Sequence, residues 1–207
     1  MGCSAVLPKY KYKNKSFQEN LIFKLIILLV SRQKRIFAAE NLKNKMRQNY
    51  KIELVEEYEK VNFYSILLEG NELTEMESFF EKFPVGCEYD EEIDVVISWI
   101  DKIAETGALE RYFRPEGKYG DGVGVIPIDV GNKIRLYCLR LSDKILIFGN
   151  GGVKDATTWE ESEELAPYVK LLIDTSRFIS SRISDGSLVL IDKEIVGNLN
   201  FVRYEKE

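Results

Sequence analysis

The chain has 207 residues, 45% of them hydrophobic and 30% charged, with a formal net charge of −5, which is typical of a globular protein of one domain with appendages or two small domains. Histidine is absent, which excludes His-based catalytic triads and removes the commonest ligand of catalytic zinc. The three cysteines, Cys3, Cys87 and Cys138, show no CxxC spacing, so we expect no disulfide framework and a cytoplasmic protein.

The charge is unevenly distributed along the chain. Residues 1–45 hold ten Lys/Arg against two Asp/Glu, a net +8, whereas residues 46–207 hold nineteen against thirty-two, a net −13. An acidic body of this size argues against a protein that coats nucleic acid through a broad positive surface.

Residues 1–45 read as a basic extension around the apolar run Leu21–Val30. That run is about half of the roughly 20 residues that a membrane-spanning helix needs, so we expect no membrane partner. One interpretation is that the physiological protein begins at Met46 and lacks the extension. The other is a helix that lies on a membrane surface, with Lys and Arg flanking an apolar face.

The first part of the body predicts a hairpin followed by two helices. Residues 50–70 alternate apolar and polar on both sides of Glu59–Lys60, which indicates a β-hairpin. Thr74 and Glu77 form a capping-box pattern for a short helix. A longer helix begins at Asp90, its expected N-cap, and ends at Gly107. Its apolar stripe, which we assign to the core, comprises Ile93, Val96, Ile97, Ile100, Ile103 and Ala104.

Three strand signals follow, at 122–130, 133–141 and 144–149, and their short connections predict an antiparallel meander. Pro127 places the first of them at an edge or a bulge. A helical region covers 158–183, with a kink or division at Pro167, and the tail predicts a hairpin that turns at Asp192–Lys193. The fold class is therefore α+β, with the N-terminal hairpin and the meander forming an antiparallel sheet packed against helices, and a C-terminal helix and hairpin. We divide the chain into 1–45, 46–160 and 161–207.

Two glycine clusters, "GDGVGV" at 120–125 and "GNGGVKD" at 149–155, suggest phosphate binding at first sight. The first leads into a strand, and the second lacks the Walker spacing, so we predict that both are turns. The acidic runs "YDEEID" and "WEESEE" suit the first turns of helices, where carboxylates interact favourably with the helix dipole.

The basic residues around the meander are the strongest candidates for a site. Arg135 and Tyr137 share one face of their strand, whereas Arg140 lies on the other. The whole group comprises Arg111, Arg114, Lys118, Arg135, Arg140 and Lys154. In one interpretation they converge to grip a phosphate or another anion. In the other, each pairs with a neighbouring Asp or Glu at the surface and has no functional role.

The stretch "KIRLYCLRLSDKILIFGNGGVKD", at 133–155, follows a hairpin and helices and precedes another helix. In this arrangement it resembles the RelE/HigB branch of the RelE/ParE toxin superfamily. Those proteins pair helices with an antiparallel sheet that has an arginine on an aromatic-apolar strand. A D-x-K-like turn, an apolar strand and a short basic run come next. The resemblance covers Lys51 to Trp159 and is best between Ile134 and Lys154.

The resemblance implies a toxin held in check by a protein antitoxin, and in its catalytic members a ribosome-dependent mRNA endonuclease that uses neither metal nor cofactor. By position, Arg135 and Lys154 would be the catalytic residues that neutralise the scissile phosphate. The residues implied to contact RNA are Arg111, Arg114, Lys118, Arg140 and Trp159. The strand at 122–130 carries none of the lysines of catalytic members, and Asp155 replaces a further basic residue. The alternative is therefore a non-catalytic protein-interaction module that retains the toxin fold.

Overall fold

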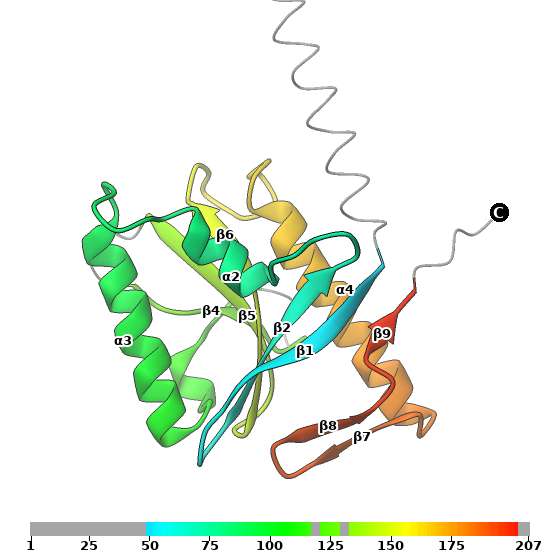
Figure 1. Cartoon of the computed structure of the whole chain (residues 1–207). Helices are drawn as coiled ribbons and strands as arrows, with labels where there is room; N and C mark the ends of the chain where they lie inside the picture. Colours follow the sequence, from blue (N-terminus) through cyan, green and yellow to red (C-terminus); the bar gives the residue numbers. More distant parts are fainter. Residues whose placement is uncertain (1–48, 117–120, 129–132, 203–207) are drawn as a thin grey trace, which may run out of the picture. The chain divides into compact units, whose positions relative to one another are not determined.

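The computed structural model of the chain describes residues 49–116, 121–128 and 133–202 (Figure 1). The extension 1–45 and the proposed start at Met46 lie outside the described residues, and so does Lys118. Within the described ranges the fold is α+β with a mostly antiparallel sheet, which confirms the predicted fold class at that level.

The main sheet has seven strands in the order β3-β4-β5-β6-β2-β1-β9. These strands are β1 (Tyr50–Glu57), β2 (Asn62–Leu68), β3 (Arg114–Pro115), β4 (Val123–Val125), β5 (Ile134–Ser142), β6 (Ile145–Val153) and β9 (Asn200–Phe201). Every neighbouring pair is antiparallel except β2 and β6, which run parallel over residues 62–65 and 145–148. The prediction of an antiparallel sheet did not include this pair, because side-chain alternation identifies a strand but not the direction of its partner.

Three α-helices accompany the sheet in the described part of the chain: α2 (Glu75–Glu81), α3 (Asp90–Thr106) and α4 (Ala166–Ser184). The capping box of α2 is confirmed, since Thr74 Oγ1 accepts the Glu77 N–H and Glu77 Oε2 accepts the Thr74 N–H at 2.8 Å. Helix α3 stops at Gly107, as predicted. Asp90 is its first residue, and Tyr89 is the N-cap in place of the predicted Asp90. The Asp90 carboxylate accepts the Gly86 N–H at 2.7 Å.

Helix α4 begins later than the sequence predicted. It starts at Ala166, and the stretch 159–164, which contains four glutamates, lies ahead of it mostly in turns. Pro167 therefore lies in the first turn and neither kinks nor divides the helix. The physical reason is that proline lacks an N–H and has a fixed φ, both of which a first helical turn accommodates and a helix interior does not.

The glycine stretch Gly149–Gly152 is not a turn, contrary to our prediction, but part of β6. Close packing explains the glycines. A Cβ on Gly151 would lie 1.7 Å from the Arg135 carbonyl oxygen, and one on Gly152 would lie 2.2 Å from Glu164 Oε1. The strand predicted at 122–130 is also shorter, because β4 ends at Val125, before Pro127.

Helices lie on both faces of the sheet (Figure 1), and two hydrophobic clusters of the described residues fill the space between the layers. Helices α2 and α3 cover one face, where Phe79 and Val96 pack with Leu136 of β5. Helix α4 covers the other face together with a second, two-stranded sheet of β7 (Leu188–Ile191) and β8 (Glu194–Gly197). Strand β5 therefore sends alternate side chains into different clusters, as its sequence predicted.

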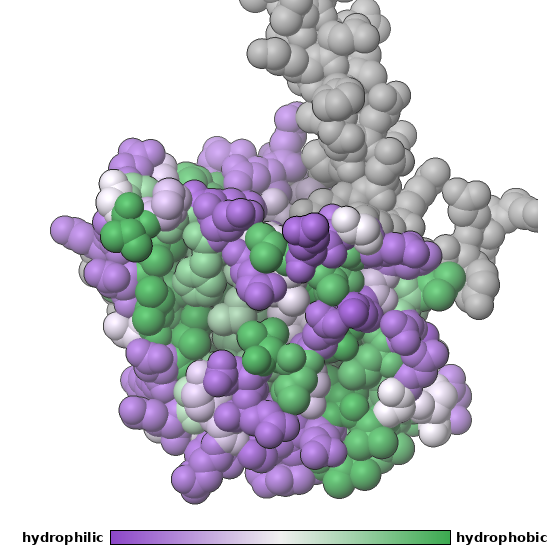
Figure 2. All heavy atoms as spheres, viewed as in Figure 1, coloured by the Kyte–Doolittle hydropathy of each residue, from purple (hydrophilic) through white to green (hydrophobic). Residues whose placement is uncertain are grey.

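The β7–β8 hairpin turns at Asp192 and Lys193, and Asp192 has a φ of 53°. Apolar side chains are exposed on its outer face, and Figure 2 shows hydrophobic surface at the lower right, where Figure 1 places this hairpin. Val189, Ile191 and Val196 are 48%, 56% and 43% exposed there.

Candidate functional site

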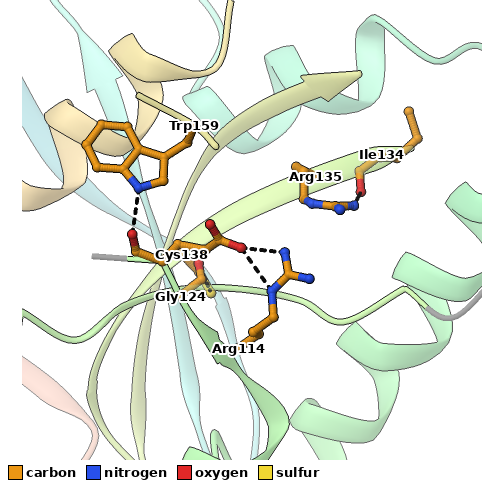
Figure 3. A network of polar contacts seen from close by, with 7 residues as sticks. Arg114, Gly124, Ile134, Arg135, Cys138 and Trp159 are labelled. Atoms are coloured by element: carbon orange, nitrogen blue, oxygen red, sulfur yellow. Dashed lines mark hydrogen bonds and ion pairs between the residues drawn. The ribbon is translucent and has the colours of Figure 1, made fainter. Parts of the chain in front are cut away.

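Arg135 occupies the middle of the structure and not its surface. It lies on the face of β5 that is covered by α4, with only 3% of the residue exposed. Its Nη1 donates to the carbonyl oxygen of Ile134 at 2.8 Å (Figure 3). Burial lowers the pKa of the Arg135 guanidinium, and the positive charge of Arg114 lowers it further. Arg114 and Arg135 are therefore close enough to repel each other.

Arg114, Glu116 and Trp159 form a chain of polar contacts beside Arg135 (Figure 3). Arg114 donates through Nε to Glu116 Oε1 at 2.9 Å and makes an ion pair with the same oxygen through Nη2. The indole Nε1 of Trp159 donates to the Glu116 carbonyl oxygen at 2.6 Å. Thus the structure brings three of the residues implied by the toxin resemblance, Arg114, Arg135 and Trp159, into one region around Glu116.

The other predicted site residues lie elsewhere or serve other contacts. Arg140 is at the far end of β5, five residues from Arg135 or roughly 17 Å along a strand. It donates through Nε to the Ala108 carbonyl at 2.6 Å and pairs with Asp143. The Arg111 guanidinium lies 5.2 Å from the ring centroid of Tyr112. Lys154 is exposed just after β6, where its backbone N–H donates to Lys133.

Tyr137, on the same face of β5 as Arg135, is only 1% exposed. Burial raises the pKa of its hydroxyl well above the ordinary value. Tyr137 therefore stays protonated at neutral pH and is unsuited to act as a general base.

A polar cluster that sequence reasoning missed lies where β2 separates from β6. β2 pairs with β6 only as far as Phe148, so no strand within the described ranges pairs with the next residues of β6 on that side. Lys82, the residue that follows α2, donates hydrogen bonds to this unpaired part of β6 through its Nζ. It donates to Asn150 Oδ1 at 2.8 Å, to the Gly151 carbonyl at 2.7 Å and to the Tyr168 hydroxyl at 2.7 Å. The Gly151 N–H donates to the same Asn150 oxygen at 2.8 Å.

A pocket of about 580 Å³ opens beside this cluster, at the carboxyl end of β6. The segment between α2 and α3 forms one side of it, and the residues before α4 form the other. Its lining is Lys82, Phe83, Cys87, Glu88, Tyr89, Val153 and Glu164. Nothing in the sequence indicates the pocket, because its two sides are more than 70 residues apart in the chain.

Glu164 is the electrostatically unusual residue of this pocket. Burial raises the pKa of its carboxyl above the ordinary value, although nearby Lys82 lowers it in part. Glu164 makes no hydrogen bond or ion pair with the other residues that the structure describes. Its carboxylate is seated over Gly152, where any side chain would displace it. On the opposite side, a hydrogen bond to the Glu88 carboxylate raises the pKa of the Tyr89 hydroxyl.

Comparison with known proteins gives no further assignment, since no family model, curated protein or solved structure matches this chain. Within residues 49–116, 121–128 and 133–202, no helix has the length and apolarity to cross a membrane. The same residues contain no group of three or more Cys, Asp or Glu side chains that could hold a metal ion.

Proposed function

We propose that the chain is a protein-interaction module that retains a RelE/HigB-like toxin fold and works with a protein partner without cutting RNA. The observation that carries this proposal is the state of the arginines around β5. Arg135 is buried, Arg114 is paired with Glu116, and Arg140 is held by Ala108 and Asp143.

A phosphate contact by any of these arginines would first have to displace an internal one. A guanidinium that gives up an ion pair and a backbone contact loses about as much as a new phosphate contact supplies, because both are charge-assisted hydrogen bonds. For Arg135 the protein packed over it would also have to move. The acidic body, with a net charge of −13 over residues 46–207, adds repulsion of a polyanion.

The proposal is tested by expressing the tagged full chain in its natural host. We expect no growth arrest, and we expect a protein partner to co-purify in stoichiometric amount after RNase treatment and a high-salt wash. Growth arrest that Arg135→Ala relieves, with no such partner, would contradict the proposal.

RNA cleavage is the second candidate function, and one observation favours it. Burial and then the charge of Arg114 lower the pKa of Arg135, so two guanidinium groups lie near each other in the region of Trp159 and Glu116. Lys154, exposed just beyond β6, would supply a further cation to such a site. This function predicts a growth arrest that Lys154→Ala relieves without lowering the melting temperature, since an exposed lysine contributes little to stability.

A further inference from the structure

The pocket at the carboxyl end of β6 has the composition of a site for a cationic group. Two carboxylates, Glu88 and Glu164, line it from opposite sides, and the rings of Phe83 and Tyr89 supply aromatic surface. Carboxylates and aromatic faces both attract a cation, the first by charge and the second by the ring quadrupole.

Lys82, the basic residue among the described residues of the lining, satisfies this demand only in part, since its charge lowers the pKa of Glu164 but the pKa stays above the ordinary value. Lys82 has three N–H donors, and Asn150, Gly151 and Tyr168 accept all three. The Lys82 ammonium thus donates to acceptors next to the end of the β2–β6 pairing, and Glu164 receives no hydrogen bond from the described residues. Glu164 as a residue is exposed, so an incoming cation can reach it, while burial of its carboxyl raises the pKa. A cation that donates to this carboxylate replaces hydration that the carboxylate has partly lost.

We propose that this pocket binds an arginine side chain of the protein partner, an inference that rests on the proposed function as an interaction module. A guanidinium fits better than an ammonium, because its planar fork can donate to carboxylates on two sides while its flat face stacks on an aromatic ring. The volume of about 580 Å³ exceeds what one side chain needs, so the pocket also admits the neighbouring backbone. The net negative charge of residues 46–207 also attracts a basic partner from a distance and speeds its association.

The test uses a capped tripeptide, acetyl-Gly-Arg-Gly-amide, as the probe. Its matched control contains citrulline, which has the shape of arginine but no charge. The two peptides are titrated into the isotopically labelled full chain, and backbone amide shifts are followed by NMR. We expect the arginine peptide to shift the amides of Cys87 and Val153, and the citrulline peptide to shift neither.

Two variants locate the binding group. Glu164→Gln is expected to weaken binding of the arginine peptide by about tenfold or more, the effect of losing one charge-assisted hydrogen bond. Glu160→Gln removes an equal charge from the same segment outside the pocket lining and is expected to change binding less than about twofold. If Glu164→Gln alters the folded spectrum, Glu88→Gln serves as the second variant, with the same expected loss.

Equal binding of the two peptides, or equal effects of Glu164→Gln and Glu160→Gln, would overturn the arginine assignment. Neither result depends on whether the natural partner has been found. The peptide titration can therefore refute arginine binding while co-purification still supports an interaction module. Likewise, co-purification can fail while the pocket still binds the arginine peptide.

Discussion

Replacing Gly151 with alanine tests whether the glycines of β6 are required by packing. The new Cβ would lie 1.7 Å from the Arg135 carbonyl oxygen and 3.1 Å from Leu136 Cα, both of them backbone atoms that cannot rotate away. Strands β5 and β6 must therefore separate at this point, which is where Arg135 and the Lys82 contact are held.

The cost follows from two terms. Overpacking of a well-packed interior typically costs about 1–3 kcal/mol. Weakening the bond from Lys82 to the Gly151 carbonyl, a hydrogen bond to a charged group, costs about 1.5 kcal/mol or more. A total of about 3 kcal/mol corresponds to a fall in melting temperature of roughly 6–12 °C for a chain of this size.

The matched control is Gly70→Ala. Gly70 has a φ of +82° with nothing within 4 Å of an added Cβ, so only backbone strain of about 1 kcal/mol is expected. Thermal unfolding followed by circular dichroism compares the two variants. A Gly151→Ala protein that is no less stable than Gly70→Ala would refute the packing argument for β6.

Two further variants probe the polar cluster and the pocket. Lys82→Met removes the Lys82 donor from the buried Gly151 carbonyl and leaves Asn150 Oδ1 with the Gly151 N–H as its donor, so urea unfolding should show a loss of about 1–3 kcal/mol in the free energy of unfolding. A loss below about 0.5 kcal/mol would show that the Lys82 contacts do not stabilise the fold. For Glu164, whose folded-state pKa is raised, the folded protein binds the proton more tightly than the unfolded chain does. The wild type should therefore lose stability relative to Glu164→Gln as the pH rises through that raised pKa, whereas below the ordinary carboxyl pKa the charge no longer contributes. Melting temperatures of the two proteins between pH 4 and 7 check this trend, and a wild type that gains relative to the variant with rising pH would contradict it.

The features that the sequence predicted correctly are those with local causes. The capping box of α2 depends on residues three positions apart, and the two faces of β5 follow from side-chain alternation. The site implied by the resemblance to toxins stays a prediction, although three of its residues, Arg135, Arg114 and Trp159, do lie in one region. The pairs Arg114–Glu116 and Arg140–Asp143 follow the second interpretation of the sequence, in which each arginine pairs with a neighbouring acid. The burial of Arg135 did not follow from the sequence, because it depends on the elements that pack over β5.

The features that the sequence did not reveal depend on contacts between distant residues. Lys82 reaches acceptors 68 to 86 positions away, and a lone lysine at the end of a short helix carries no sign of that role. The glycines of β6 were misread for the same reason. A glycine that makes room for a distant backbone or carboxylate looks identical in the sequence to a glycine that permits a turn.

The most direct test of the account is to map the 5′ ends of a reporter mRNA in a translating cell extract supplied with the purified full chain. Because the arginines around β5 are committed to internal contacts, we predict the same ends as in an extract that received buffer alone. New ends within the translated region, present with the wild type and absent with a Lys154→Ala protein of unchanged melting temperature, would contradict the account.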